Sequence, residues 1–141
     1  MKKKIIFICT HNSARSQIAE GLTNHFFSNQ WEAFSAGTEK TFVKPMAIKA
    51  LEKIGIDISL HRSKLSTEFK GMKFDIVVTV CDSAKDNCPF FPDAKKYIHK
   101  SFKDPSETKG NNEEILEAFV KSRDEIHNWI EKLFALEAKN G

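Results

Sequence analysis

This sequence of 141 residues lacks a hydrophobic run long enough to cross a membrane, and it lacks a strong excess of either charge. Its 22 lysines and arginines against 19 acidic residues leave a net charge of +3, which is too small to indicate nucleic-acid binding. Repeats, low-complexity segments and linkers are also missing. With 40% hydrophobic and 29% charged residues, we expect one globular domain over residues 1–141.

Cysteine is scarce, with three residues, and none has the spacing of a zinc ligand. No Cys-x2-Cys pair occurs and the histidines are scattered, so we expect no metal site. The apolar run Ile5–Ile8 is too short for a signal peptide and is soon interrupted by polar residues, which favours a cytoplasmic protein. In that compartment an odd number of thiols favours nucleophilic or redox chemistry over a static disulfide framework.

One segment near the N-terminus concentrates chemically useful groups between a predicted strand and a predicted helix. It consists of Cys9, Thr10, His11, Asn12, Ser13, Ala14, Arg15 and Ser16. Free N–H groups at a helix N-terminus bind tetrahedral anions, and Arg15 adds a fork that matches two oxyanion oxygens. We therefore expect residues 10–15 to hold an oxyanion. The same positive field predicts a lowered pKa for Cys9, which would make it a nucleophilic thiolate.

A structural role is the alternative for this segment, because cysteine is often buried and Asn12 and Ser13 are good helix caps. That alternative does not explain Arg15, since a cation at the start of a helix opposes the helix dipole. We therefore favour the anion-binding interpretation.

Strand-like and helix-like segments alternate along the chain, which is typical of a parallel sheet covered by helices. We expect an α/β fold with a four-stranded parallel sheet and helices on both faces. Strands are predicted at 4–9, 31–36, 74–80 and 97–102, and helices at 14–28, 45–54, 66–70 and 113–138, with an irregular or partly helical segment at 81–92. Ligands of such sheets bind beyond the C-terminal strand ends, where Cys9 and Cys81 lie. If their strands are neighbours, about 4.8 Å apart, a disulfide between them is within reach.

The Cys-x5-Arg-Ser pattern between a strand and a helix resembles the low-molecular-weight protein tyrosine phosphatase superfamily. Together with Cys81, Cys88-Pro89 and Asp104-Pro105, it resembles the thioredoxin-coupled arsenate reductases of that superfamily. The resemblance implies a three-layer αβα fold and a thiol relay. In this relay Cys9 attacks arsenate, Cys81 attacks Cys9 and releases arsenite, and Cys88 then attacks Cys81. Thioredoxin would reduce the resulting disulfide.

The resemblance also implies roles for other residues. Ser16 would donate a hydrogen bond to the Cys9 sulfur, and Asp104 would protonate the departing oxygen. Some members bind potassium through residues that match Asn12, Glu20 and Ser35 together with an acid, but the acid position corresponds to Lys64 here. We therefore expect no potassium site, because the Lys64 ammonium can supply the positive charge itself. We also expect no tightly bound cofactor.

Two other functions stay open. The first is a phosphatase that uses only Cys9, Arg15 and Asp104, although its relatives usually carry tyrosines after Asp-Pro where this chain has Ser106-Glu107. The second is a non-catalytic oxyanion sensor. The expected ligands are arsenate, with phosphate or sulfate as competing anions, and we expect a monomer.

Overall fold

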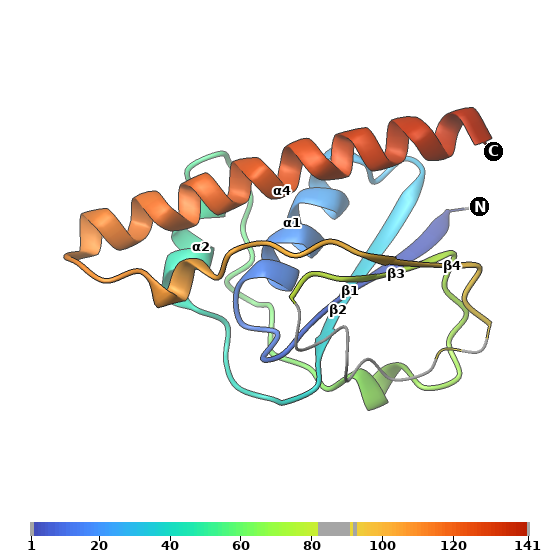
Figure 1. The fold of residues 1–141 in the computed structure, drawn as a ribbon, viewed down its shortest axis with the longest axis horizontal. Coiled ribbons are helices and arrows are strands. Elements are labelled where there is room, and N and C mark those ends of the chain that lie inside the picture. The colour runs from blue at the N-terminus through green and yellow to red at the C-terminus, as the bar shows by residue number, and fades with distance from the viewer. Residues whose placement is uncertain (1, 82–90, 92, 141) are drawn as a thin grey trace.

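The computed structural model describes residues 2–81, 91 and 93–140 (Figure 1). Four strands form one wholly parallel sheet in the order β2-β1-β3-β4. They are β1 (Lys3–Cys9), β2 (Trp31–Gly37), β3 (Ile76–Thr79) and β4 (Lys96–His99). Strand β3 has the sequence Ile-Val-Val-Thr, which is β-branched throughout, and each of its residues is buried, as expected for a central parallel strand. The predicted four-stranded parallel sheet is confirmed.

Within the described residues, three α-helices and two short 3-10 helices connect or follow these strands. They are α1 (Arg15–Phe26), α2 (Pro45–Glu52), η1 (Ser66–Phe69), η2 (Pro105–Glu107) and α4 (Asn112–Asn140). In α1, Ile18 and Leu22 repeat at four residues and are completely buried. Proline at the start of α2 suits a first helical turn, where its missing N–H is not needed. The predicted helices therefore form, with ends that differ by a few residues.

Side chains of β2 alternate between the two faces of the sheet. Trp31 stacks on Phe134 of α4, with ring centroids 4.4 Å apart. Phe34 points the other way, where its ring lies 5.7 Å from those of Phe69 in η1 and Phe74. Helices α1 and α4 thus cover one face, and η1 lies on the other (Figure 1).

The parallel register of β1 and β3 brings the C-terminal ends of these two strands to the same edge of the sheet. Ile8 of β1 pairs with Thr79 of β3, and the N–H of Val80 donates to the Ile8 carbonyl over 2.9 Å. The next residues along the two strands are Cys9 and Cys81, so the predicted neighbour relation of their strands is confirmed. Most of the expected irregular segment at 81–92 is outside the described residues, namely 82–90 and 92, and this part includes Cys88. Across the described helices, none combines the length and apolar character needed to span a bilayer.

Candidate active site

The loop between β1 and α1 has the geometry of an anion cradle. Cys9 ends the strand, and Asn12 adopts a left-handed backbone conformation with φ of 51°, a region where asparagine is enriched. Helix α1 begins at Arg15, and its N-cap residue Ala14 provides no side-chain cap. No side chain caps the N–H groups of the first helical turn, which suits the predicted oxyanion site, and the Ser16 backbone N–H bonds the Cys9 sulfur.

The Cys9 sulfur is buried, with 3% of the residue exposed. The Ser16 hydroxyl lies 2.9 Å from it, and the Asn12 N–H donates to it over 3.2 Å. Burial is nevertheless the largest influence and raises the pKa of the Cys9 thiol, while hydrogen bonds from Ser16 and the charge of Arg15 lower it. The predicted net lowering of this pKa is therefore wrong for this loop. The motif shows which groups stabilise a thiolate, but not how deeply the sulfur is buried.

Replacing Ser16 by alanine should move the pKa of Cys9 further upward, because the largest opposing influence is removed. A raised pKa leaves less thiolate at any pH below it, so alkylation by iodoacetamide should be about tenfold slower near neutral pH. The measurement is the pH dependence of Cys9 alkylation in a Cys81→Ser/Cys88→Ser background. Ser28→Ala, in the turn after α1, is the matched control. An unchanged pH profile in Ser16→Ala would remove Ser16 from its assigned role.

Arg15 and Asp104 meet at the mouth of the loop. The Arg15 Nη2 lies 3.4 Å from Asp104 Oδ2, and Nη1 donates to the Phe102 carbonyl over 2.9 Å. The other carboxylate oxygen of Asp104 accepts from both the N–H and the hydroxyl of Ser106. Asp104 thus overhangs the Cys9 loop, and this predicted placement is confirmed.

A small hollow lies where these groups converge, lined by Cys9, His11, Ser13, Ala14, Arg15 and Asp104. The Arg15 guanidinium already pairs with the Phe102 carbonyl and with Asp104 at this hollow, so an oxyanion bound there would share or replace these contacts.

Arg15→Lys should lower kcat/KM for the arsenate reduction that the sequence resemblance implies by about 100-fold or more, although the charge is kept. A lysine ammonium is a point charge, so it cannot bridge two oxygens in one plane as a guanidinium does. Steady-state kinetics with arsenate measure the effect. Arg62→Lys is the control, because Arg62 is an exposed residue whose side chain pairs with Glu68. Near-normal kinetics in Arg15→Lys would show that Arg15 has only a structural role.

The second cysteine lies beside the first residue of the loop. Cys81 is 5% exposed, and its sulfur is 3.3 Å from the Thr10 hydroxyl. Both Cys9 and Cys81 are free thiols. The structure therefore brings the predicted nucleophile and the predicted second thiol to one place, while Cys88 is outside the described residues.

The side chains of the loop itself divide into two groups. His11 and Ser13 line the hollow, and the exposed His11 ring lies 3.6 Å from Glu39. The side chains of Thr10 and Asn12 turn away from it, toward Cys81 and Ser16 respectively. These two residues can therefore serve an oxyanion only through their backbone.

Several residues that support the loop were missed by sequence reasoning. Gln17 donates to both the carbonyl and the side-chain oxygen of Asn12, and the Ser63 hydroxyl donates to the His11 carbonyl over 2.8 Å. A Cβ at Gly37 would lie 2.7 Å from the Thr10 carbonyl, so glycine is needed for this close approach. The position of Gln17 directly after Arg15-Ser16 is a usable signal, but nothing in the sequence marks Ser63.

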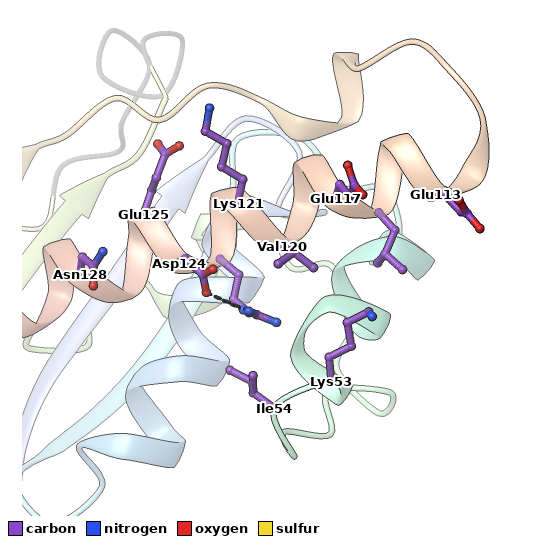
Figure 2. Close-up of a pocket in the computed structure, with 11 residues that line it drawn as sticks. Lys53, Ile54, Glu113, Glu117, Val120, Lys121, Asp124, Glu125 and Asn128 are labelled. Atoms are coloured by element: carbon purple, nitrogen blue, oxygen red, sulfur yellow. Dashed lines mark hydrogen bonds and ion pairs between the residues drawn. The ribbon is translucent and has the colours of Figure 1, made fainter.

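A second, larger hollow lies between the end of α2 and the middle of α4 (Figure 2). Its volume is about 860 Å³, and its lining mixes charges of both signs with the apolar Ile54, Leu116 and Val120. Arg123, one of its lining residues, is already paired with Asp124 over 2.9 Å. None of the described residues that line this hollow is a cysteine, so they offer no thiol like that of the Cys9 loop.

Comparison with known proteins finds relatives of this chain by sequence. A family model described as low molecular weight phosphotyrosine protein phosphatase matches residues 4–139. A protein named arsenate reductase from Halalkalibacterium halodurans is 44% identical over 134 residues, which cover 95% of this chain and 96% of that protein.

Solved structures agree with the sequence matches. An arsenate reductase in the phosphate binding state superposes with a TM-score of 0.78 at 29% identity, covering 94% of this chain and 97% of that one. A thioredoxin-dependent arsenate reductase from Corynebacterium glutamicum gives a TM-score of 0.65 at 29% identity, over 92% of this chain and 62% of that one. The chain therefore belongs to the low molecular weight phosphotyrosine protein phosphatase family, among relatives that are named arsenate reductase.

Proposed function

We propose that this protein reduces arsenate to arsenite through a relay of Cys9, Cys81 and Cys88, and that thioredoxin restores the thiols. The observation that carries the proposal is the position of Cys81 at the end of β3, beside the loop that begins with Cys9. A phosphatase needs one thiol at this edge of the sheet, whereas a reductase needs a second one within reach. Relatives named arsenate reductase support the same assignment.

The first step is formation of a bond between the Cys9 sulfur and arsenic. Arsenate enters the hollow as Arg15 turns from its present partners to the anion, and the amides at the start of α1 hold the other oxygens. The Cys9 thiolate attacks arsenic, and one oxygen leaves as water after receiving protons. Asp104, which lines the same hollow, is the nearby carboxyl group that can deliver a proton to that oxygen.

The second step transfers two electrons from sulfur to arsenic. The Cys81 thiolate attacks the Cys9 sulfur, the sulfur–arsenic bond breaks, and its electron pair leaves with arsenic as arsenite. Cys9 and Cys81 are then joined by a disulfide. Phosphorus does not accept this electron pair, so a phosphate ester can only be hydrolysed at the same loop.

The third step frees the nucleophile. The Cys88 thiolate attacks the Cys81 sulfur, which releases Cys9 as a thiolate and leaves a Cys81–Cys88 disulfide. An external dithiol protein then reduces this disulfide and is itself oxidised. Thioredoxin is the partner we propose, because a thioredoxin-dependent arsenate reductase has a similar fold. A relay that starts each cycle from free thiols suits the reducing cytoplasm, and we propose that the protein acts there as a monomer without a tightly bound cofactor.

Hydrolysis of phosphate esters is the second candidate function. The observation in its favour is that Cys9, Arg15 and Asp104 line one hollow, which supplies a nucleophile, an oxyanion fork and a carboxyl group. This activity would leave Cys81 unused.

One experiment distinguishes the two activities. The protein is incubated with arsenate, thioredoxin, thioredoxin reductase and NADPH, and both NADPH oxidation and arsenite are measured. A parallel reaction contains a phenyl phosphate ester alone. We expect arsenate-dependent NADPH oxidation with one arsenite formed per NADPH. Ester hydrolysis without arsenate reduction would replace the proposal by a phosphatase, and inactivity in both assays would leave an oxyanion-binding protein.

A further inference from the structure

Lys64 lies in a largely enclosed position beneath the anion loop. Its carbonyl accepts from the N–H of Gly37 at the end of β2, which fixes the backbone at this point. Its side chain is only 13% exposed, and the ammonium is 3.4 Å from Glu20 Oε1 and 3.5 Å from the Ser35 hydroxyl. The Arg62 carbonyl is a third acceptor, at 3.1 Å. A lysine ammonium with three acceptors has used all its hydrogen-bonding capacity.

The partner of this ammonium is a carboxylate that needs a cation. The Glu20 side chain is also 13% exposed, and a buried charge without a partner is strongly unfavourable. The Ser35 hydroxyl donates to Glu20 Oε1, and the His61 ring lies 3.9 Å from Oε2. The neighbouring Arg62 guanidinium is bound to Glu68 over 2.7 Å, and among the described lysines and arginines Lys64 is the one paired with Glu20.

Three potential ligands of a potassium ion are present, namely Asn12, Glu20 and Ser35, but they do not suit that ion here. The Asn12 side-chain oxygen already accepts from Gln17 and from the backbone N–H of Lys64, each over 2.9 Å. The oxygens of Glu20 and Ser35 face the ammonium. A potassium ion would put a second positive charge against a single carboxylate, and the two cations would repel each other.

A chain of hydrogen bonds runs from Lys64 to the nucleophile. The backbone N–H of Lys64 donates to the Asn12 side chain, whose amide donates to the Ser16 hydroxyl over 2.7 Å. That hydroxyl lies 2.9 Å from the Cys9 sulfur. The position of Lys64 therefore affects the position of Asn12, the loop residue with the left-handed backbone. Through Asn12 and Ser16 it affects the surroundings of the Cys9 sulfur.

We propose that the Lys64 ammonium is the resident cation of the Glu20–Ser35 site, that it positions the Cys9 loop through Asn12, and that this protein neither binds nor needs potassium. Lys64 is thus a positioning residue, since it touches neither the substrate nor the reacting sulfur. The activity part of this inference rests on the proposed arsenate reduction, while its binding and thiol-reactivity parts do not.

The test compares the wild-type protein with Lys64→Asp and Lys64→Met in potassium chloride and in choline chloride, at a matched ionic strength of about 0.1 M. Lys64→Asp replaces the ammonium by a carboxylate and so completes a set of oxygen ligands for potassium. Lys64→Met keeps the length of the side chain without its charge. Lys70→Met, at an exposed position, is the control. Readouts are the melting temperature, the alkylation rate of Cys9 in a Cys81→Ser/Cys88→Ser background, and arsenate reduction.

For the wild-type protein and Lys70→Met we expect no response to potassium in any readout. For Lys64→Asp, potassium should raise the melting temperature by at least about 2 °C. It should also restore an alkylation rate and an arsenate reduction rate that are about tenfold lower in choline. Lys64→Met should show slower Cys9 alkylation than Lys70→Met in choline.

Two results would overturn the inference. The first is a wild-type protein that potassium stabilises or activates, which would mean that the site still binds the ion. The second is Lys64→Met with the alkylation rate of Lys70→Met, which would mean that the ammonium does not position the thiol. Failure of arsenate reduction in the wild-type protein would instead overturn the proposed function, and the melting and alkylation readouts would still decide the role of Lys64.

Discussion

Cys9→Ser should abolish arsenate reduction, with a loss of at least about 10⁴-fold in kcat/KM. A serine hydroxyl is not ionised near neutral pH, whereas a thiol can be, and only sulfur can form the disulfide through which two electrons reach arsenic. Hydrolysis of a phenyl phosphate ester should be lost as well, since it uses the same nucleophile. Arsenite formation and ester hydrolysis are measured on the same preparation.

The fold of Cys9→Ser must be checked as a control, because Cys9 is buried in the core beside Ser16 and its replacement can disturb the packing there. A far-ultraviolet circular dichroism spectrum and a melting temperature close to those of the wild-type protein would show that the fold is kept. Residual arsenate reduction above about 1% of the wild-type rate would contradict the assignment of Cys9 as nucleophile.

Cys81→Ser and Cys88→Ser should each reduce multiple-turnover arsenate reduction by about 100-fold or more, and both should keep any ester hydrolysis. They act after Cys9 has attacked, so the two variants should stop at different points. Cys81→Ser should release no arsenite, because the sulfur–arsenic bond is not broken. Cys88→Ser should release one arsenite per protein molecule and accumulate a Cys9–Cys81 disulfide.

Mass spectrometry of Cys88→Ser after exposure to arsenate tests this order directly, with a protein that was not exposed as the control. A peptide pair that joins Cys9 to Cys81 is the expected product, since Cys81 lies beside the Cys9 loop in the structure. Arsenite release without that disulfide would mean that another thiol takes the electrons, and the relay would need a different second member.

Most elements of the fold could be predicted because they depend on local patterns. Residues 76–79 form β3 and are all buried, in agreement with an apolar run in a central strand. Pro45 likewise marked the start of α2, and the four-residue spacing of Ile18 and Leu22 marked the buried side of α1. The pairing of β1 with β3 depends on how segments far apart in the chain pack. From the sequence alone, this pairing was an assumption and not a prediction.

The candidate site shows the same division between local and distant effects. The motif from Cys9 to Ser16 predicted that a thiol, a guanidinium and a hydroxyl lie together, because their spacing along one strand–loop–helix unit fixes their relation. The partners of Arg15 were not predictable, since the Phe102 carbonyl that it contacts is 87 residues away in the chain. The sequence therefore did not predict how Arg15 is held at the hollow.

By itself, then, the sequence determined the candidate reacting groups: one thiol at a strand end, an arginine at the following helix start, and a second thiol after another strand. Only the tertiary structure decided the surroundings of those groups. Burial raises the pKa of Cys9, Asp104 and Phe102 contact Arg15, and the Lys64 ammonium pairs with Glu20, 44 residues away. Burial and charge pairing depend on distances between residues far apart in the chain, which local spacing does not specify.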